Sequence, residues 1–211
     1  MKDPKLGVVI LAAGEASRMG QAKQLLTLKG RTLLEMCVQK AITLQPRSIV
    51  TVLGAHFAKT QPEVDKVRQK YLEAPIDWVE NQHWASGMGS SIQMGVQKNL
   101  MKCPDTTQIL ILLADQPLIH TAQLQTLLEA FRSGSQTIVA SKYGNGFGVP
   151  AVFDQSLFEE LLQLNEKAGA KKIMKKYQNR MQLVAVPEGA FDVDTPEEYE
   201  MIRQRIEEVN S

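Results

Sequence analysis

Charged side chains follow the apolar runs of this sequence, and their types suit the chemistry of phosphates and metal ions. The residues concerned are Arg18, Lys23, Asp115, Asp192 and Asp194. An arginine grips phosphate oxygens with its planar fork, a lysine adds a point charge, and one or two carboxylates can hold Mg2+ beside substrate phosphates. The pattern therefore indicates a site for a phosphorylated ligand together with a divalent cation.

The first candidate loop follows the apolar run Leu6–Ala13. Ala12, Ala13 and Gly14 let a ligand approach the backbone closely, and freed N–H groups in such a loop form an anion-binding concavity. The loop matches neither a Walker A sequence nor a dinucleotide-binding fingerprint. From spacing alone, a solvated polar loop with two surface cations is an equally good interpretation.

A second candidate segment combines two glycines with two serines at the start of a helical pattern. Gly87 and Gly89 mark a tight turn, and Ser90 or Ser91 is expected to be the helix N-cap. Hydroxyl and amide groups at a helix start can also hold a ribose, a base edge or a phosphate. From the residues alone, capping without ligand binding is the favoured interpretation.

Acidic residues end one apolar run and open the last helical pattern. Asp115 is well placed to hold Mg2+, and an aspartate that only supports a turn or caps a helix is the alternative. Asp192 and Asp194 stand at i and i+2 in an extended stretch, so they point the same way. Either one could complete a metal site with Asp115, and Asp194 is modestly favoured. The alternatives are a structural hydrogen bond for Asp192 and a favourable helix N-terminal charge for Asp194.

The elements that must position these side chains alternate along the chain. Apolar runs predict strands that are covered on both faces, over Leu6–Ala13, Ile49–Leu53, Ile76–Val79, Ile109–Ala114, Thr137–Ser141 and Leu183–Val186. Helices are predicted over Arg31–Leu44, Pro62–Leu72, Ser90–Leu100, Ala122–Phe131, Leu157–Leu164 and Glu197–Val209, the last with Thr195 as N-cap and Pro196 in its first turn. This alternation predicts an α/β protein with a mostly parallel sheet, whose ligands gather at the carboxyl ends of the strands.

Length and composition exclude several other classes of protein. The 211 residues are 44% hydrophobic and show no linker, which predicts one globular domain over residues 1–211 rather than a collagen or a coiled coil. A net charge of +1 gives no support to binding of nucleic acid or of a membrane surface, and no apolar run has the roughly 18 residues of a membrane span.

Cys37 and Cys103 lack metal-ligand spacing and are expected to be reduced in a cytoplasmic protein. The short apolar run near the start is expected to be retained rather than cleaved as a signal peptide.

Four of these segments together resemble the MobA-like NTP transferase superfamily and, within it, the molybdenum cofactor cytidylyltransferases. They are Leu11-Ala-Ala-Gly14 with Ser17-Arg-Met-Gly20 and Lys23, Gly87-Met-Gly-Ser-Ser-Ile92, Asp115-Gln-Pro117, and Asp192-Val-Asp-Thr-Pro-Glu-Glu-Tyr199. The resemblance spans roughly residues 7–199. It implies a Rossmann-like three-layer fold of the nucleotide-diphospho-sugar transferase type.

The resemblance also implies a reaction and a role for each matching residue. CMP would move from CTP to the phosphate of a molybdopterin-type cofactor, with release of pyrophosphate and with Mg2+ as cofactor. The residues implied to carry catalysis are Arg18, Lys23, Asp115 and Asp194, and Asp115 and Asp194 among them would hold the metal. The residues implied to bind the nucleotide are Leu11, Ala12, Ala13, Gly14, Arg18, Lys23, Gly87, Gly89, Ser90, Ser91 and Asp115.

The acceptor side departs from the family pattern. Gly148 and Pro150 resemble an element that contacts the acceptor, but Phe147 stands where the family has a basic residue. Lys171 replaces the arginine of a second element, which keeps the charge and loses the planar fork. Gly148, Pro150 and Lys171 are the expected acceptor contacts. A transient contact with a molybdoenzyme or its chaperone is a further expected partner.

Two alternatives remain open at this point. In the first, the enzyme uses GTP as its nucleotide, or transfers the nucleotide to a different phosphorylated small molecule. In the second, the chain is a non-catalytic pterin carrier that docks onto an apo-enzyme. Arg18, Lys23, Asp115 and Asp194 argue against a carrier, since a carrier would not need a complete set of triphosphate-binding residues.

Overall fold

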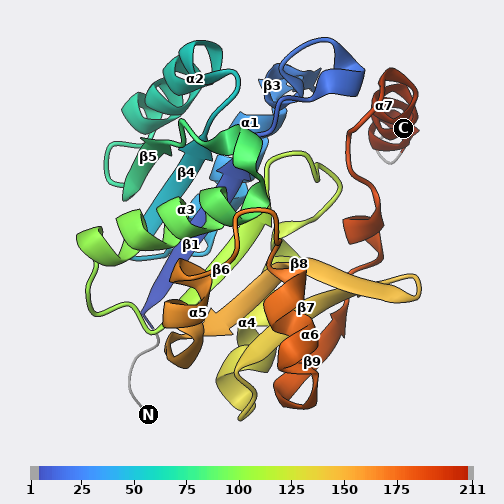
Figure 1. Ribbon diagram of the computed structural model, residues 1–211. Helices are drawn as coiled ribbons and strands as arrows, with labels where there is room; N and C mark the ends of the chain where they lie inside the picture. Colours follow the sequence, from blue (N-terminus) through green and yellow to red (C-terminus); the bar gives the residue numbers. More distant parts are fainter. Residues whose placement is uncertain (1–4, 209–211) are drawn as a thin grey trace.

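The apolar runs form strands of a seven-stranded sheet within residues 5–208, the part of the chain that the computed structural model describes (Figure 1). The strand order is β5-β4-β1-β6-β8-β7-β9. The strands are β1 Leu6–Ala12, β4 Ser48–Leu53, β5 Ile76–Glu80, β6 Gln108–Leu113, β7 Ile138–Tyr143, β8 Gly146–Asp154 and β9 Met181–Ala185. Only β8 runs against its neighbours, so the predicted α/β fold with a mostly parallel sheet is confirmed.

Helices cover both faces of this sheet and make three layers (Figure 1). One face carries α1 Leu33–Thr43, α2 Phe57–Lys70 and α4 Thr121–Ser133. The other face carries α3 Met88–Lys102, α5 Phe158–Leu162 and α6 Lys171–Lys176. Val8 and Ile10 of β1 pack into the first core, and Val9 and Leu11 pack into the second. Burial on both faces explains why this strand is apolar without a break.

A third apolar cluster ties the C-terminal segment to the beginning of the chain. Leu28 and Leu33 pack there against Val193 and Ile202. The elements involved are α1, the small sheet of β2 Thr27–Leu28 and β3 Arg31–Thr32, and α7 Pro196–Glu208. The backbone N–H of Val193 also donates to the carbonyl of Asp115 at 3.0 Å. The residues that precede α7 are therefore held beside the end of β6.

The predicted cap of the last helix is confirmed. The hydroxyl of Thr195 accepts from the backbone N–H of Glu198 at 3.2 Å, and the Glu198 carboxylate accepts from the backbone N–H of Thr195 at 2.9 Å. These two bonds form a capping box, which satisfies two of the N–H groups left free at a helix start. The predicted end of this helix, Val209, lies outside the described residues.

Several other boundaries differ from the prediction. Helix α2 begins at Phe57 and carries Pro62 in its interior, although proline has no N–H for the helical ladder. Helix α1 begins at Leu33, because the two preceding residues pair as β3 and Thr32 caps the helix. Strand β8 is not among the strands that the apolar runs predict, because Gly146, Gly148 and Pro150 interrupt its pattern. The predicted helix over Leu157–Leu164 is shorter, since α5 ends at Leu162. Helix α6 is not among the predicted helices.

No helix within residues 5–208 is long and apolar enough to cross a bilayer.

Candidate active site

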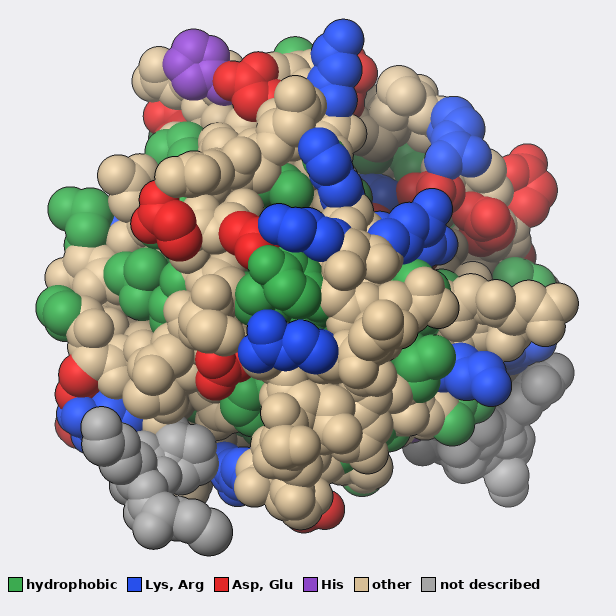
Figure 2. Space-filling model, turned by 60° about the horizontal axis from the view of Figure 1, so that its bottom comes forward, with side chains coloured by type: hydrophobic (Ala, Val, Ile, Leu, Met, Phe, Trp, Pro, Cys, Tyr) green, Lys and Arg blue, Asp and Glu red, His purple; other side chains and the backbone are tan. Residues whose placement is uncertain are grey.

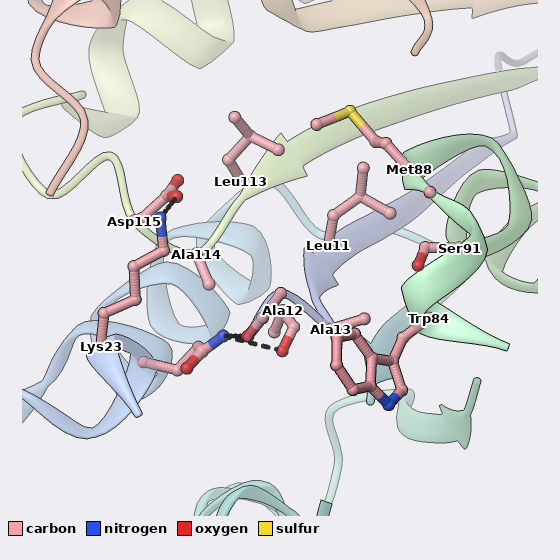
Figure 3. A pocket seen from close by; sticks show the side chains of 13 residues that line it. Leu11, Ala12, Ala13, Lys23, Trp84, Met88, Ser91, Leu113, Ala114 and Asp115 are labelled. Atoms are coloured by element: carbon pink, nitrogen blue, oxygen red, sulfur yellow. Dashed lines mark hydrogen bonds and ion pairs between the residues drawn. The ribbon is translucent and has the colours of Figure 1, made fainter. Parts of the chain in front are cut away.

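A cavity of about 270 Å3 opens where β1 and β6 end (Figure 3). This is the position that the carboxyl-end rule for parallel sheets predicts. Its lining consists of Leu11, Ala12, Ala13, Gly14, Lys23, Gln24, Trp84, Gly87, Met88, Ser91, Leu113, Ala114 and Asp115. Most of the predicted nucleotide contacts line this cavity, whereas Arg18, Gly89 and Ser90 do not.

The cavity has a charged end around Lys23. The Nζ atom of Lys23 lies 2.5 Å from Asp115 Oδ2 and 2.7 Å from Asp194 Oδ1. Burial opposes the positive charge, but the two carboxylates outweigh it and raise the pKa of Lys23 above its ordinary value. The hydrogen bond from Lys23 is the main reason why the pKa of Asp194 lies below its usual range. Lys23 and Asp194 are therefore both charged at neutral pH.

Arg18 reaches the same carboxylate from the solvent side. Its Nη2 atom lies 2.7 Å from Asp194 Oδ2, and two thirds of the Arg18 side chain is exposed. Asp194 thus holds two cations, one inside the cavity and one at its rim. A phosphate that entered the charged end would find both cations within a short movement of their side chains.

The backbone of the first loop is held by a residue that sequence reasoning missed. Gln24 is buried, and its Nε2 atom donates to the carbonyls of Ala12 at 3.1 Å and Gly14 at 3.0 Å. These bonds fix the small residues that face the cavity. The sequence does not indicate that Gln24 is buried, because glutamine is mostly exposed in proteins.

The donors at the charged end suit a divalent cation. Carboxylate oxygens are the ligands that Mg2+ takes, and Asp115 Oδ1 is buried with no hydrogen-bond partner in the described chain. Burial and the neighbouring charge of Asp115 raise the pKa of Asp192 to about 6, and Gln116 donates to its Oδ1 at 2.9 Å. No group of three or more candidate metal ligands converges in residues 5–208. The donor chemistry of Asp115 and Asp194 suits a divalent cation, and the cation that contacts both carboxylates in this structure is Lys23.

The cavity has a neutral end formed by Trp84, Met88 and Ser91 (Figure 3). Asn81 follows β5 directly and is fully buried behind this end. Its Nδ2 atom donates to Ser90 Oγ at 2.8 Å and to Ser91 Oγ at 2.9 Å. Sequence reasoning missed Asn81, although a polar residue directly after a strand is the same signal that selected Asp115.

The expectation that Ser90 or Ser91 caps α3 is wrong. The helix begins at Met88 with Gly87 as its N-cap, and both serines lie inside the first turns. Ser90 Oγ donates to the carbonyl of Gly87 at 2.8 Å instead of accepting from a free N–H group. The oxygen atoms of both hydroxyls instead accept from the buried amide of Asn81.

The two glycines of this segment allow a close contact with the backbone of residues 165–168. The N–H of Gly89 donates to the carbonyl of Glu166 at 2.8 Å. A Cβ atom on Gly89 would lie 2.1 Å from the carbonyl oxygen of Asn165, and one on Gly87 would lie 2.5 Å from that of Glu166. Gly87 also has a φ of 132°. The backbone of residues 165–168 therefore packs directly on the start of α3.

The expected acceptor residues lie outside the cavity lining. Gly148 and Pro150 are buried near the start of β8, which runs antiparallel to β6 and so begins at the edge where β6 ends. The Nζ atom of Lys171 lies 5.6 Å from the ring centroid of Phe147, a cation–π arrangement. Phe147 thus lies against a basic group, although it is not basic itself.

The surface charges of the protein are mixed. Figure 2 shows Lys and Arg side chains across the middle of one face, with Asp and Glu side chains among them. This distribution agrees with the net charge of +1 and does not form a single-sign surface on that face.

The chain belongs to a family of nucleotidyltransferases. The model of the MobA-like NTP transferase domain matches residues 8–181, which confirms the resemblance to this superfamily. The chain is 30% identical to the purine catabolism protein PucB of Bacillus subtilis (strain 168), and the match covers 97% of this chain and 98% of PucB.

Solved structures share the same fold. Rv0371c from Mycobacterium tuberculosis H37Rv is 24% identical and superposes with a TM-score of 0.74 over 95% of this chain and 98% of its own. Rv0371c has also been solved in complex with manganese. The 4-diphosphocytidyl-2C-methyl-D-erythritol synthase from Anaerococcus prevotii is 14% identical and superposes with a TM-score of 0.75 over 97% of this chain and 96% of its own.

Proposed function

We propose that this protein transfers CMP from CTP to the phosphate of a molybdopterin-type cofactor and releases pyrophosphate. One observation carries the proposal, namely that the two ends of a single cavity differ in chemistry. The charged end suits a triphosphate with a divalent cation. The neutral end offers apolar walls and one serine hydroxyl, which suit a flat base with a few polar atoms.

The proposed reaction needs positioning and charge stabilisation rather than a covalent enzyme intermediate. An oxygen of the acceptor phosphate would attack the α-phosphorus of CTP, and the bond to pyrophosphate would break. Lys23 and Arg18 would neutralise charge on the triphosphate and on the leaving pyrophosphate. Asp115 and Asp194 would hold Mg2+, which when bound would neutralise phosphate oxygens.

The acceptor would enter from the side of β8. Gly148 and Pro150 would shape the backbone there, and Lys171 would supply the positive charge for the acceptor phosphate. We further propose that residues 1–211 work as one nucleotidyltransferase domain with a small-molecule acceptor. Contact with a molybdoenzyme or its chaperone and a cytoplasmic location remain predictions from the sequence.

Thermal unfolding with each of CTP, GTP, ATP and UTP, with and without Mg2+, tests the proposal. A ligand present at about 100 times its dissociation constant stabilises the folded protein by about 2.7 kcal/mol. We expect the largest increase in melting temperature with CTP and Mg2+. A shift in melting temperature that is selective for GTP would mean that the protein uses GTP instead of CTP. No shift with any nucleotide, together with a shift on addition of a pterin phosphate alone, would instead favour the carrier function.

A further inference from the structure

The orientation of the Asn81 side-chain amide is fixed by its surroundings. The backbone N–H of His83 donates to Asn81 Oδ1 at 2.9 Å. Because Asn81 is fully buried, turning the amide over would place its NH2 group against another donor and leave both without acceptors. The amide nitrogen must therefore face the two serine hydroxyls.

The two hydroxyls that accept from Asn81 differ in what their own protons do. Ser90 Oγ donates to the carbonyl of Gly87 at 2.8 Å, so its proton is already used. Ser91 Oγ accepts from Asn81 at 2.9 Å and donates to no residue in the described chain. Ser91 is also the one of the two that lines the cavity. Its proton is thus left to point toward a ligand.

We propose that Asn81 is a positioning residue that fixes Ser91 as a hydrogen-bond donor to the ring carbonyl oxygen O2 of a pyrimidine base. The inference rests on the proposed function, because it takes the neutral end of the cavity to be the base site. Cytosine and uracil both present an acceptor at O2, whereas guanine presents its N2 amino donor on the corresponding edge. A fixed donor at Ser91 selects pyrimidines over guanine and does not distinguish cytosine from uracil.

A double-mutant cycle with Asn81→Asp and Ser91→Ala tests this positioning role. The aspartate has the shape of asparagine but would accept from Ser91, which turns the serine proton away from the cavity. Dissociation constants for CTP, UTP and GTP are measured by calorimetry with Mg2+. Ser86→Ala is the matched control, since Ser86 lies in the same loop, donates to the carbonyl of His83 and neither contacts Asn81 nor lines the cavity.

We expect each single variant to weaken binding of CTP and UTP by about tenfold, the effect of one hydrogen bond, with little change for GTP. The double variant should bind CTP no more weakly than Ser91→Ala alone, because the Asn81 effect passes through Ser91. The control should stay within about twofold of the wild type.

Three outcomes would overturn the proposal. Additive losses in the double variant would mean that Asn81 supports the loop without orienting Ser91. Equal losses for CTP and GTP in Ser91→Ala would place the hydroxyl on the ribose instead of the base. Full CTP affinity in Ser91→Ala would show that Ser91 donates no hydrogen bond to the nucleotide. If Asn81→Asp does not fold, as judged by circular dichroism, the same cycle is run with Asn81→Ala, which removes the donated bond without adding charge.

Failure of the proposed function looks different. A wild-type protein that binds no pyrimidine nucleotide would contradict the cytidylyl transfer itself. A wild-type preference for CTP together with an additive cycle would leave the function intact and reject only the role of Asn81.

Discussion

The two ends of the cavity hold their side chains by different means. At the charged end, Lys23 is bound to Asp194 across 171 positions of sequence, and the contacts are ion pairs. At the neutral end, Asn81 holds two serines that are 9 and 10 positions away through neutral hydrogen bonds. The charged end can exchange partners when phosphate or a cation arrives. The neutral end is built to keep one geometry, which suits the recognition of shape and polarity.

The largest expected effect is at the charged end, where Asp115→Ala removes a proposed metal ligand. Turnover, followed as pyrophosphate release from CTP, should fall by at least about a hundredfold. The fold should persist, because Asp115 lies at the edge of the core. Asp105→Asn is the control, since Asp105 forms an exposed pair with Lys5 far from the cavity. Wild-type turnover in Asp115→Ala would exclude it as the metal ligand.

Lys23→Ala tests whether the charged end binds the triphosphate. The loss of a buried cation should weaken CTP binding by about tenfold or more, measured by calorimetry. Lys66→Ala serves as the comparison, because Lys66 is exposed and pairs loosely with Glu63 at 3.7 Å. Unchanged CTP affinity in this variant would mean that Lys23 has a purely structural role.

Gly89→Ala tests the contact between the start of α3 and residues 165–168. The added Cβ would lie 2.1 Å from the carbonyl oxygen of Asn165, so the free energy of unfolding should fall by about 1–3 kcal/mol in urea denaturation. Gly146→Ala is the matched substitution, since its nearest neighbour would be 3.7 Å away. Equal stability of the two variants would mean that this segment moves aside freely.

The smallest expected effect is a pH dependence at Asp192. Its pKa is about 6 in the folded protein and about 3.8 when exposed, so ionising Asp192 destabilises the fold as pH rises through this interval. Asp192→Asn should therefore unfold at the same free energy as wild type below pH 4 and be more stable above pH 7. The gain should be no more than about 2 kcal/mol. The measurement is made in EDTA, because a bound cation would favour the ionised carboxylate of Asp192. A gain that is constant with pH would reject this origin.

The sequence predicted the parallel part of the sheet better than the rest. Strands β1, β4 and β6 are buried on both faces, so their apolar runs carry the signal locally. Strand β8 contains Gly146, Gly148 and Pro150, which are turn signals, and only its pairing with β6 and β7 makes it a strand. Local pattern does not encode such tertiary pairing.

The sequence likewise predicted some features of the candidate site and not others. Lys23, Asp115 and Asp194 were identified because charged residues that follow an apolar run or open a helical pattern are visible in the sequence. Their shared ion pairs were not, because these depend on how the C-terminal segment returns to the first loop. Gly87 and Gly89 are predicted to form a tight turn, and in this structure the backbone of residues 165–168 also requires them to be small.

The return of the chain to its first loop has a consequence for the order in which the protein is made. The last strand of the sheet ends at Ala185, so every strand described here is synthesised before Asp194. Lys23 therefore receives its second carboxylate from a segment that follows the whole sheet in the chain. A chain cut between Ala185 and Asp194 would thus keep every described strand of the sheet and lose one of the two carboxylates that contact Lys23.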